Sequence, residues 1–214
     1  MALLLACVAR GQTNFTYTSG TLSTPVPDGN PIGITESTTT AGLLGSVVNV
    51  QVHLDITGGF NGDLYAYLAG PGGYTAILLN RSGVTAGNAF GYADAGFNIT
   101  LDDSGVNIHN YESTFNPGGA QLTGTWQPDG RAIDPQSAPS LFDSTSPTAL
   151  LGGFDGYNNA NGTWTLFLAD LSAGGQSTLV SWGLTVVTVP EPQTWAMLAG
   201  GAGMLFAFRR RGIR

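Results

Sequence analysis

The chain has 214 residues, of which 42% are hydrophobic and 10% charged, and it contains 32 glycines and 11 prolines. The hydrophobic fraction argues against disorder, and the glycines and prolines favour short strands joined by turns over long helices. Between Gln12 and Val189, thirteen acidic residues oppose two arginines, a net charge of about −11 that excludes a nucleic-acid-binding protein, because such binding depends on Lys and Arg.

The chain opens on an apolar stretch, MALLLACVAR, which has the core of a secretory signal without the usual preceding positive residues. Small residues stand at cleavage-type spacing in Ala9-Arg10-Gly11, so we interpret residues 1–11 as a signal-peptide remnant and 12–23 as a linker. The alternatives are an ordinary apolar N-terminus and a lipoprotein-type cleavage site at Cys7. Cys7 is the single cysteine, which excludes an intramolecular disulfide.

Residues 47–56, VVNVQVHLDI, alternate almost strictly between apolar and polar side chains. This period predicts a half-buried antiparallel strand. The expected inner face consists of Val48, Val50, Val52, Leu54 and Ile56, and the expected outer face of Asn49, Gln51, His53 and Asp55.

Further strands are predicted at 63–68, 75–79, 97–101, 163–169 and 179–187. Many short strands with turn signals between them indicate an all-β sandwich or barrel. Between Ser104 and Gly153 the alternation weakens, and we expect long loops over one edge of the sandwich.

Two segments of the body carry a resemblance to a known domain family. Their matching residues are Gly62-Asp63-Leu64, Leu68, Pro71 and Gly72, and then Phe154, Gly156, Asn161-Gly162-Thr163-Trp164, Leu166, Asp170, Gly174, Leu179, Trp182 and Leu184. They resemble the P domain, or P/Homo B domain, which follows the catalytic domain in proprotein convertases. The resemblance implies a jelly-roll sandwich of about eight strands over residues 24–189. One departure is Thr57-Gly58-Gly59-Phe60, where the family usually has a His-Thr pair.

The sequence offers little for nucleophilic catalysis, which needs a base within reach of the nucleophile. No Gly-Thr-Ser or His-Gly-Thr motif of a subtilisin-like protease occurs, and the P domain is non-catalytic in its family, so we predict no enzyme. We expect His53 to be a solvent-facing strand residue. His109 lies in a predicted loop near Asp102, Asp103 and Glu112, where it is a candidate metal ligand.

Calcium is the candidate ion, because hard cations take carboxylate and carbonyl oxygens from turn-rich loops. The candidate ligands are Asp63, Asp102, Asp103 and Asp155, the last with Asn158 and Asn159. None has the spacing of an EF-hand. The alternative for each is a turn residue that hydrogen-bonds its own backbone.

Tyr65 and Tyr67 lie on the strand face opposite Leu64 and Leu68. They are a candidate aromatic platform for sugar. The alternative is that both rings pack under a loop.

The tail contains fourteen apolar or glycine residues, Trp195 to Phe208, followed by Arg209, Arg210 and Arg211. As a helix it would span about 21 Å, short for a bilayer core of about 30 Å, and thinning of the bilayer or snorkelling arginines can meet the difference. The arginines should stay cytoplasmic, which puts the body on the outer side of the membrane. We therefore predict a short C-terminal transmembrane helix.

Val189-Pro190-Glu191-Pro192, the apolar segment and the arginine cluster together resemble the PEP-CTERM sorting signal of exported bacterial proteins, over residues 189–214. In that family, also labelled as an ice-binding-protein C-terminal motif, a membrane protease called exosortase recognises Pro-Glu-Pro. The prolines favour an extended segment that a protease can grip. The alternative is a plain membrane anchor with a proline-rich stalk.

Taken together, the sequence predicts an exported bacterial surface or extracellular-matrix protein, held transiently in the inner membrane and then processed by an exosortase-type enzyme. Extracellular polysaccharide is the expected partner outside the cell, an association that comes from the sorting family. The alternatives are an accessory domain of a secreted serine protease and a carbohydrate-binding module.

Overall fold

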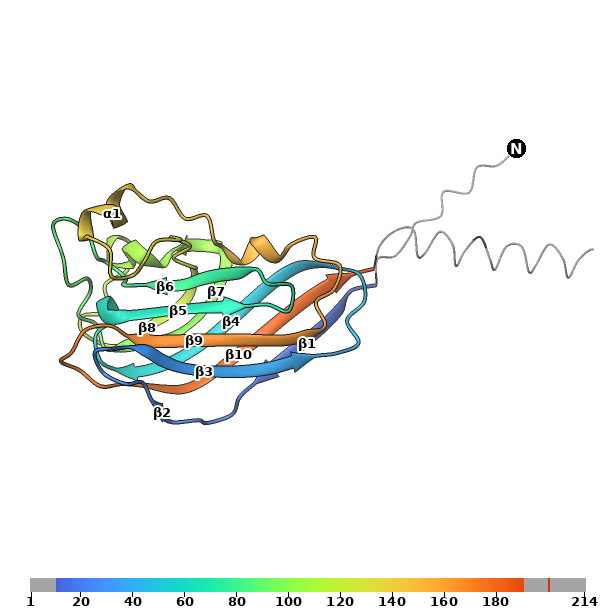
Figure 1. Cartoon of the computed structure of the whole chain (residues 1–214), viewed down its shortest axis with the longest axis horizontal. Coiled ribbons are helices and arrows are strands. Elements are labelled where there is room, and N and C mark those ends of the chain that lie inside the picture. The colour runs from blue at the N-terminus through green and yellow to red at the C-terminus, as the bar shows by residue number, and fades with distance from the viewer. Residues whose placement is uncertain (1–10, 191–199, 201–214) are drawn as a thin grey trace, which may run out of the picture.

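Two β-sheets pack face to face in the computed structural model, which describes residues 11–190 and residue 200 (Figure 1). The larger sheet has the order β1-β10-β4-β7-β8, with the two-residue β2 also paired to β10. Its strands are β1 (Thr13–Thr18), β2 (Thr24–Pro25), β4 (Ser46–Gly58), β7 (Gly96–Asn107), β8 (Leu122–Gln127) and β10 (Ser177–Val189). β8 runs parallel to β7, and the other neighbours are antiparallel.

The smaller sheet has the order β3-β9-β5-β6 and is antiparallel throughout. Its strands are β3 (Asn30–Thr40), β5 (Leu64–Ala69), β6 (Thr75–Asn80) and β9 (Gly162–Asp170). Four short helical segments lie in the connections: η1 (Asn61–Asp63), η2 (Ile108–Ser113), α1 (Pro139–Ser144) and η3 (Leu151–Phe154).

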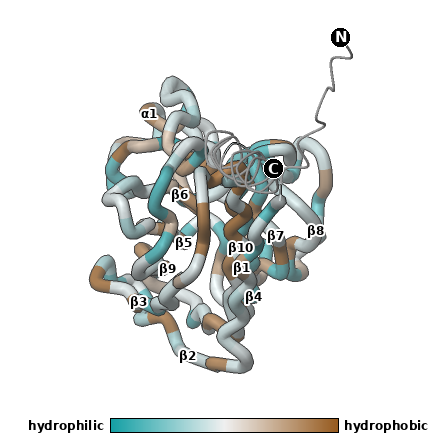
Figure 2. The backbone as a smooth tube through the Cα atoms, turned by 90° about the vertical axis from the view of Figure 1, so that its right-hand side faces the viewer, coloured by the Kyte–Doolittle hydropathy of each residue, from teal (hydrophilic) through white to brown (hydrophobic). Residues whose placement is uncertain are grey.

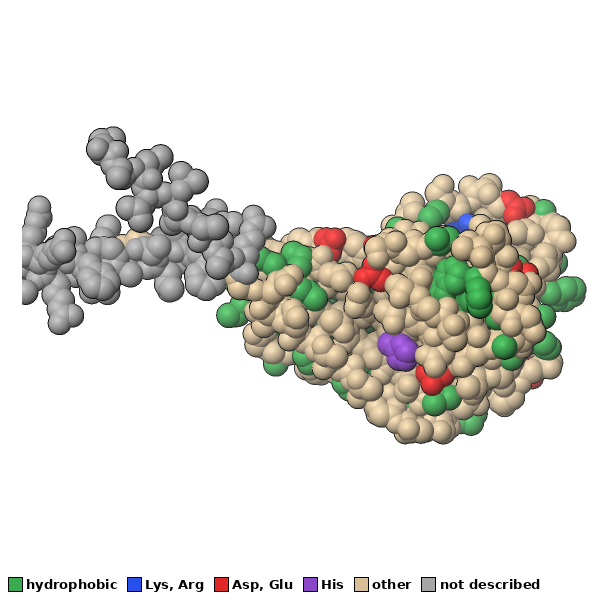
Figure 3. Space-filling model, turned by 180° about the vertical axis from the view of Figure 1, so that it is seen from behind, with side chains coloured by type: hydrophobic (Ala, Val, Ile, Leu, Met, Phe, Trp, Pro, Cys, Tyr) green, Lys and Arg blue, Asp and Glu red, His purple; other side chains and the backbone are tan. Residues whose placement is uncertain are grey.

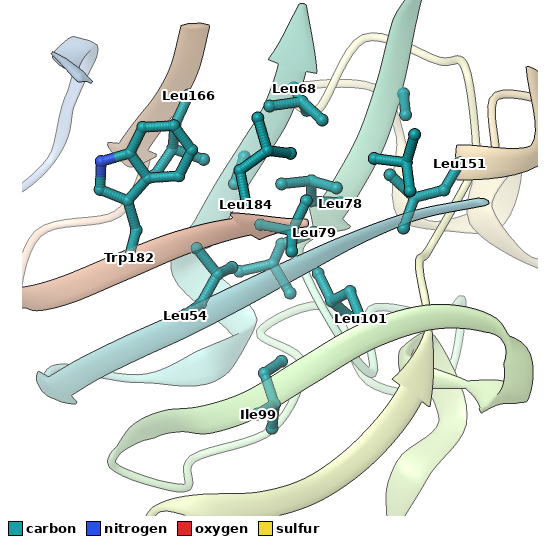
Figure 4. Close-up of a cluster of buried hydrophobic side chains, with 14 of the residues drawn as sticks. Leu54, Leu68, Leu78, Leu79, Ile99, Leu101, Leu151, Leu166, Trp182 and Leu184 are labelled. Atoms are coloured by element: carbon teal, nitrogen blue, oxygen red, sulfur yellow. The ribbon is translucent and has the colours of Figure 1, made fainter. Parts of the chain in front are cut away.

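The core lies between the two sheets because every second side chain of the central strands points inward. Figure 4 shows leucines of β4 and β10 directed toward leucines of β5 and β9. Each buried leucine contributes about 1.5–3 kcal/mol relative to an exposed one. Hydrophobic stretches recur along strands of both sheets (Figure 2).

The predicted all-β sandwich is confirmed, and each of the six predicted strands is present. Ten strands occur in the described residues, against about eight expected for a jelly roll. The helix predicted for 195–208 lies outside the described residues, apart from residue 200. Within residues 11–190 and at residue 200, no helix has the length and hydrophobicity to cross a bilayer.

Val48 does not belong to the inner face, contrary to prediction. Val47 is 1% exposed and Val48 is 43% exposed. The cause is a β-bulge in the pairing of β4 with β10, where Asn49 opposes Val187 but Val47 opposes Thr188, so Val48 is the extra residue. A bulge of one residue reverses the inward and outward order on one side of it.

Three segments without predicted strands also join the larger sheet, and the shortest of them is the two-residue β2. Residues 13–18, expected within a linker, form β1 and pair with β10 along their whole length. In the segment 104–153, expected as loops, Leu122–Gln127 forms β8 at the edge of the sheet. β1 does alternate, with Phe15 and Tyr17 packed against the core, but the run is short and otherwise polar, and β8 has only Leu122 and Trp126 as large apolar residues.

Candidate functional site

The candidate sorting segment leaves the body at the end of β10. Val189, its last residue, is paired with Ser46 of β4, and the neighbouring Thr188 is opposite Thr13 of β1. A side chain at Gly45 would clash with the Val189 carbonyl and the backbone of Pro190, so the chain is packed tightly up to this point. Glu191, Pro192 and Arg209–Arg211 lie outside the described residues.

The opposite end of the sandwich is built from three loops. Because β10 has 13 residues, this end lies about 40 Å from Val189 at about 3.3 Å per residue. The β4–β5, β6–β7 and β9–β10 connections meet there, at the left of Figure 1. Hydrophobic side chains gather at this end, the right-hand end of the space-filling view in Figure 3.

These three loops enclose a cleft of about 270 Å³, which we call the end cleft. Phe60 and Phe90 form its exposed rim, with 41% and 80% of their surface accessible. The complete lining is Phe60, Asp63, Phe90, Gly91, Tyr92, Ala93, Ser172 and Ala173. The cleft is therefore apolar at its rim and carries a carboxylate in its wall.

Glycines and one arginine hold the loops of the end cleft together. A Cβ at Gly62 would clash with the Phe90 carbonyl oxygen, so the two loops approach as closely as backbone allows. Arg81 adopts a positive φ of 51° as the chain leaves β6. Its Nε donates to the Gly62 carbonyl at 3.1 Å and its Nη2 to the Ala89 carbonyl at 3.4 Å, which ties the loop carrying Phe90 to η1.

The carboxylates at this end have unusual environments. Asp63 is 6% exposed, and burial raises its pKa, although the Ser172 hydroxyl and the Arg81 charge act against the rise. Asp170 is fully buried, and this burial raises its pKa to about 6 despite a hydrogen bond from Ser177 Oγ at 3.1 Å. The charge of Asp28 raises both values further.

The structure does not bring the four candidate calcium ligands together at one site. Asp63 lies at the end cleft, whereas Asp102, Asp103 and Asp155 lie toward the other end of the sandwich. Asp102 accepts hydrogen bonds from Gln51 and Ser104, while Asp103 points away from it and accepts from the backbone N–H groups of Leu151 and Gly152. Within residues 11–190, no three acidic, histidine or cysteine side chains converge as a metal site.

Asp103 and Asp155 do lie near one another. Both carboxylates approach Gly152, and partial burial and then the Asp103 charge raise the pKa of Asp155. Asp102 accepts from the Ser104 N–H two residues on, as in the alternative of a residue that bonds its own backbone, whereas Asp103 is bonded to a distant segment, residues 151–152. Calcium binding stays a prediction.

His109 is buried and is not near Asp102 or Asp103 in a metal site, contrary to expectation. Its Nδ1 lies 2.7 Å from Asp129 Oδ2 and its Nε2 lies 3.0 Å from the Val84 carbonyl oxygen. Both ring nitrogens are therefore occupied by protein partners. Arg131 Nη1 donates to the second oxygen of Asp129 at 3.2 Å.

Tyr65 and Tyr67 lie half-buried on the outer face of the smaller sheet, as expected from alternation. Tyr67 stacks on Phe167 of β9, with ring centroids 4.8 Å apart and an interplanar angle of 14°. Tyr65 meets both rings edge to face. One face of Tyr67 is thus covered by a neighbouring strand, and sugar binding by this platform stays a prediction.

Sequence reasoning missed the end cleft. Phe60 and Phe90 stand in loops 30 positions apart, and only the meeting of the β4–β5 and β6–β7 connections brings them together. An available signal was the pair of bulky apolar residues in glycine-rich turns, GGFNG and NAFGY, where polar residues are usual.

The predicted sorting signal is confirmed: residues 188–211 match the family model described as the PEP-CTERM protein-sorting motif. Among solved structures, the chain is similar to the Aeromonas sobria serine protease (ASP) in complex with the chaperone ORF2, at 16% identity and a TM-score of 0.49, covering 85% of this chain and 28% of that one. It is also similar to the serine protease of Aeromonas sobria, at 16% identity and a TM-score of 0.47, covering 83% of this chain and 27% of that one. The chain thus spans less than a third of either structure's length. No curated protein matches the chain.

Proposed function

We propose that this chain is an exported protein whose non-catalytic β-sandwich is presented outside the cell after an exosortase-type enzyme has processed its tail. The observation that carries this proposal is the PEP-CTERM motif at residues 188–211, which begins where β10 ends. In this proposal Val189, Pro190, Glu191 and Pro192 form the recognition segment. Arg209, Arg210 and Arg211 hold the end of the tail on the cytoplasmic side.

The junction between body and tail supports processing without unfolding. Pro190 follows the last ladder residue, and its lack of an N–H prevents β10 from extending its pairing with β4. The residue before a proline is restricted to extended conformations, which suits Val189 and Glu191. Proteolysis acts on an extended backbone outside a hydrogen-bonded sheet, so the body stays folded when the tail is removed.

The geometry also suits display. The tail leaves one end of the sandwich, and the end cleft lies about 40 Å away at the other end. While the tail is anchored, the loops at the far end therefore face away from the membrane. A role at the cell surface or in an extracellular polysaccharide matrix follows in this proposal.

The test is the intact mass, with C-terminal peptide mapping, of the protein recovered from the medium and membranes of a bacterium that carries an exosortase-type enzyme. We expect a released or surface species that ends between Val189 and Pro192. Glu191→Gln should lower the processed fraction at least severalfold, because the recognition segment of residues 189–192 loses its single charge. Glu36→Gln, the same change in β3, is the matched control and should be processed normally. A full-length tail found only in membranes, in both variants and in the parent, would overturn the proposal.

A further inference from the structure

The end cleft combines aromatic rings at its rim with a buried carboxylate in its wall. From this arrangement we infer that the cleft binds an organic ammonium group, meaning a cationic nitrogen that carries carbon substituents. Such a group meets ring faces through its carbon atoms and the carboxylate through its charge. The inference goes beyond the proposed function and does not depend on how the tail is processed.

The rim has the composition of a binding surface. Phe90 exposes 80% of its surface and Phe60 exposes 41%, although each could have been replaced by a polar turn residue without loss of core. Tyr92 lines the cleft beside them, and its ring is held by Tyr111 at a centroid distance of 4.5 Å. Aromatic faces attract cations through their quadrupole, and quaternary ammonium ligands are recognised in this way.

The wall of the end cleft supplies a negative charge, opposite to that of the ammonium group. Asp63 lines the cleft and is more than nine-tenths buried, with the Ser172 hydroxyl as a hydrogen-bond partner, so a cation there meets a carboxylate with little competing water. Asp28 and Asp170 lie near enough to raise the negative potential further. Among residues 11–190, Arg81 is the one neighbouring cation; it already donates to two backbone carbonyls, and three carboxylates outnumber it.

The volume of the end cleft and the negative sign of its charge together limit the class of ligand. The volume of about 270 Å³ lies just below the range of about 300–1,000 Å³ for drug-sized ligands, which suits a small head group or a single sugar. An anion would be repelled by the three carboxylates. A neutral apolar ligand would leave the buried Asp63 carboxylate facing hydrocarbon, which is unfavourable.

The test uses the full-length protein in a non-ionic detergent and measures binding by calorimetry and by amide NMR shifts at Gly91 and Ser172. Choline is compared with 3,3-dimethylbutan-1-ol, in which carbon replaces the charged nitrogen. We expect choline to bind at least tenfold more tightly than this neutral isostere. Glucosamine against N-acetylglucosamine makes the same comparison for a primary amine, and the better of the two cations identifies the quaternary or the primary class.

Two variants connect binding to the cleft. Asp63→Asn removes the charge with little change in shape and should weaken the preferred cation at least tenfold. Phe90→Ala, at an exposed position where folding is not at risk, should weaken it severalfold. Phe115→Ala removes an exposed ring, 49% accessible, from another loop and should leave binding unchanged.

The inference is overturned if the neutral isostere binds as well as choline and N-acetylglucosamine as well as glucosamine, or if neither cation shifts the cleft amides. It is also overturned if Phe90→Ala binds the cation like the parent, whether or not Asp63→Asn folds. None of these results bears on tail processing, which is read separately from the mass of the secreted species.

Discussion

Nδ1 of His109 lies 2.7 Å from Oδ2 of Asp129, and both side chains are buried. The other ring nitrogen faces the Val84 carbonyl oxygen at 3.0 Å, and neither a carboxylate nor a carbonyl oxygen donates a proton. With Arg131 on the second oxygen of Asp129, this network joins η2, the start of the 129–150 segment and the β6–β7 loop.

The first prediction concerns the stability that this network provides. His109→Ala leaves Asp129 buried with one partner fewer, and we expect a loss of about 3 kcal/mol in the free energy of unfolding, measured in urea. His53→Ala is the matched control on the outer face of β4 and should change that free energy by no more than about 0.5 kcal/mol. Equal effects of the two substitutions on the free energy of unfolding would contradict a stabilising role for the buried network of His109 and Asp129.

The bulge in β4 gives a second prediction, on two adjacent valines. Val47→Ala removes buried methyl groups and should cost about 2 kcal/mol, whereas Val48→Ala should cost less than about 0.5 kcal/mol. Urea denaturation of the two variants measures the difference. The reverse order would mean that the alternation continues through position 48 without a bulge.

A third prediction follows from the pKa of Asp170, which burial raises from 3.8 to about 6. Between these two values the folded protein keeps a proton that the unfolded chain releases. The contribution of Asp170 to the free energy of unfolding is therefore largest below pH 4 and falls as the pH rises toward 6. Asp170→Asn should remove this part of the pH dependence. The measurement is urea denaturation of both proteins at pH 4, 5, 6 and 7, and parallel curves for the two would refute it.

The end of β10 gives a fourth prediction, on truncation. Removing residues 191–214 leaves every pair of β10 with β1 and β4 in place, so the unfolding free energy should change by less than about 0.5 kcal/mol. Removing residues 186–214 also deletes the fully buried Val186 and the last pairs of β10, and should cost more than about 3 kcal/mol. Circular dichroism with urea distinguishes the two. Similar losses of unfolding free energy in the two truncations would contradict this prediction and mean that the tail contributes to the stability of the body.

The stacked pair on the smaller sheet gives a fifth prediction. A double-mutant cycle of Tyr67→Ala and Phe167→Ala should show a coupling of about 1 kcal/mol in the unfolding free energy, since the rings pair beyond their burial. If the platform also binds sugar, glycan-array signals should disappear in a Tyr65→Ala, Tyr67→Ala variant. A coupling without any glycan signal would leave these rings a purely structural role.

The sequence was sufficient for the central strands, because their period of two is set by one buried face. Leu54 and Ile56 were both correctly placed inside on that basis. It was not sufficient for Val48, because a bulge is a property of two paired strands and appears in neither alone. The parallel pairing of β8 with β7 was equally hidden, since Leu122 and Trp126 are the only large apolar residues of that strand.

The candidate sites also differ in how far the sequence predicts them. The sorting motif is contiguous, so Pro190 and its neighbours could be recognised without a fold. The partner of His109 is 20 positions away and the lining of the end cleft comes from three loops, and neither spacing follows a period that a sequence displays. Contacts between distant loops depend on the topology of the sheets, which the sequence pattern left undetermined.

The position of β10 also determines when the larger sheet can complete its pairing during folding. β10 lies between β1 and β4, and within the described residues the sheet gives β1 no other neighbour. Thr13 therefore has no pairing partner until Thr188, which lies 175 positions later in the chain, is in place. Long-range pairing of this kind is slow, because the chain loses the entropy of loop closure before the stabilising contacts form. A chain that is threaded across a membrane from its N-terminus would keep its larger sheet open during transit, and the sheet would close only as the sorting segment itself arrives.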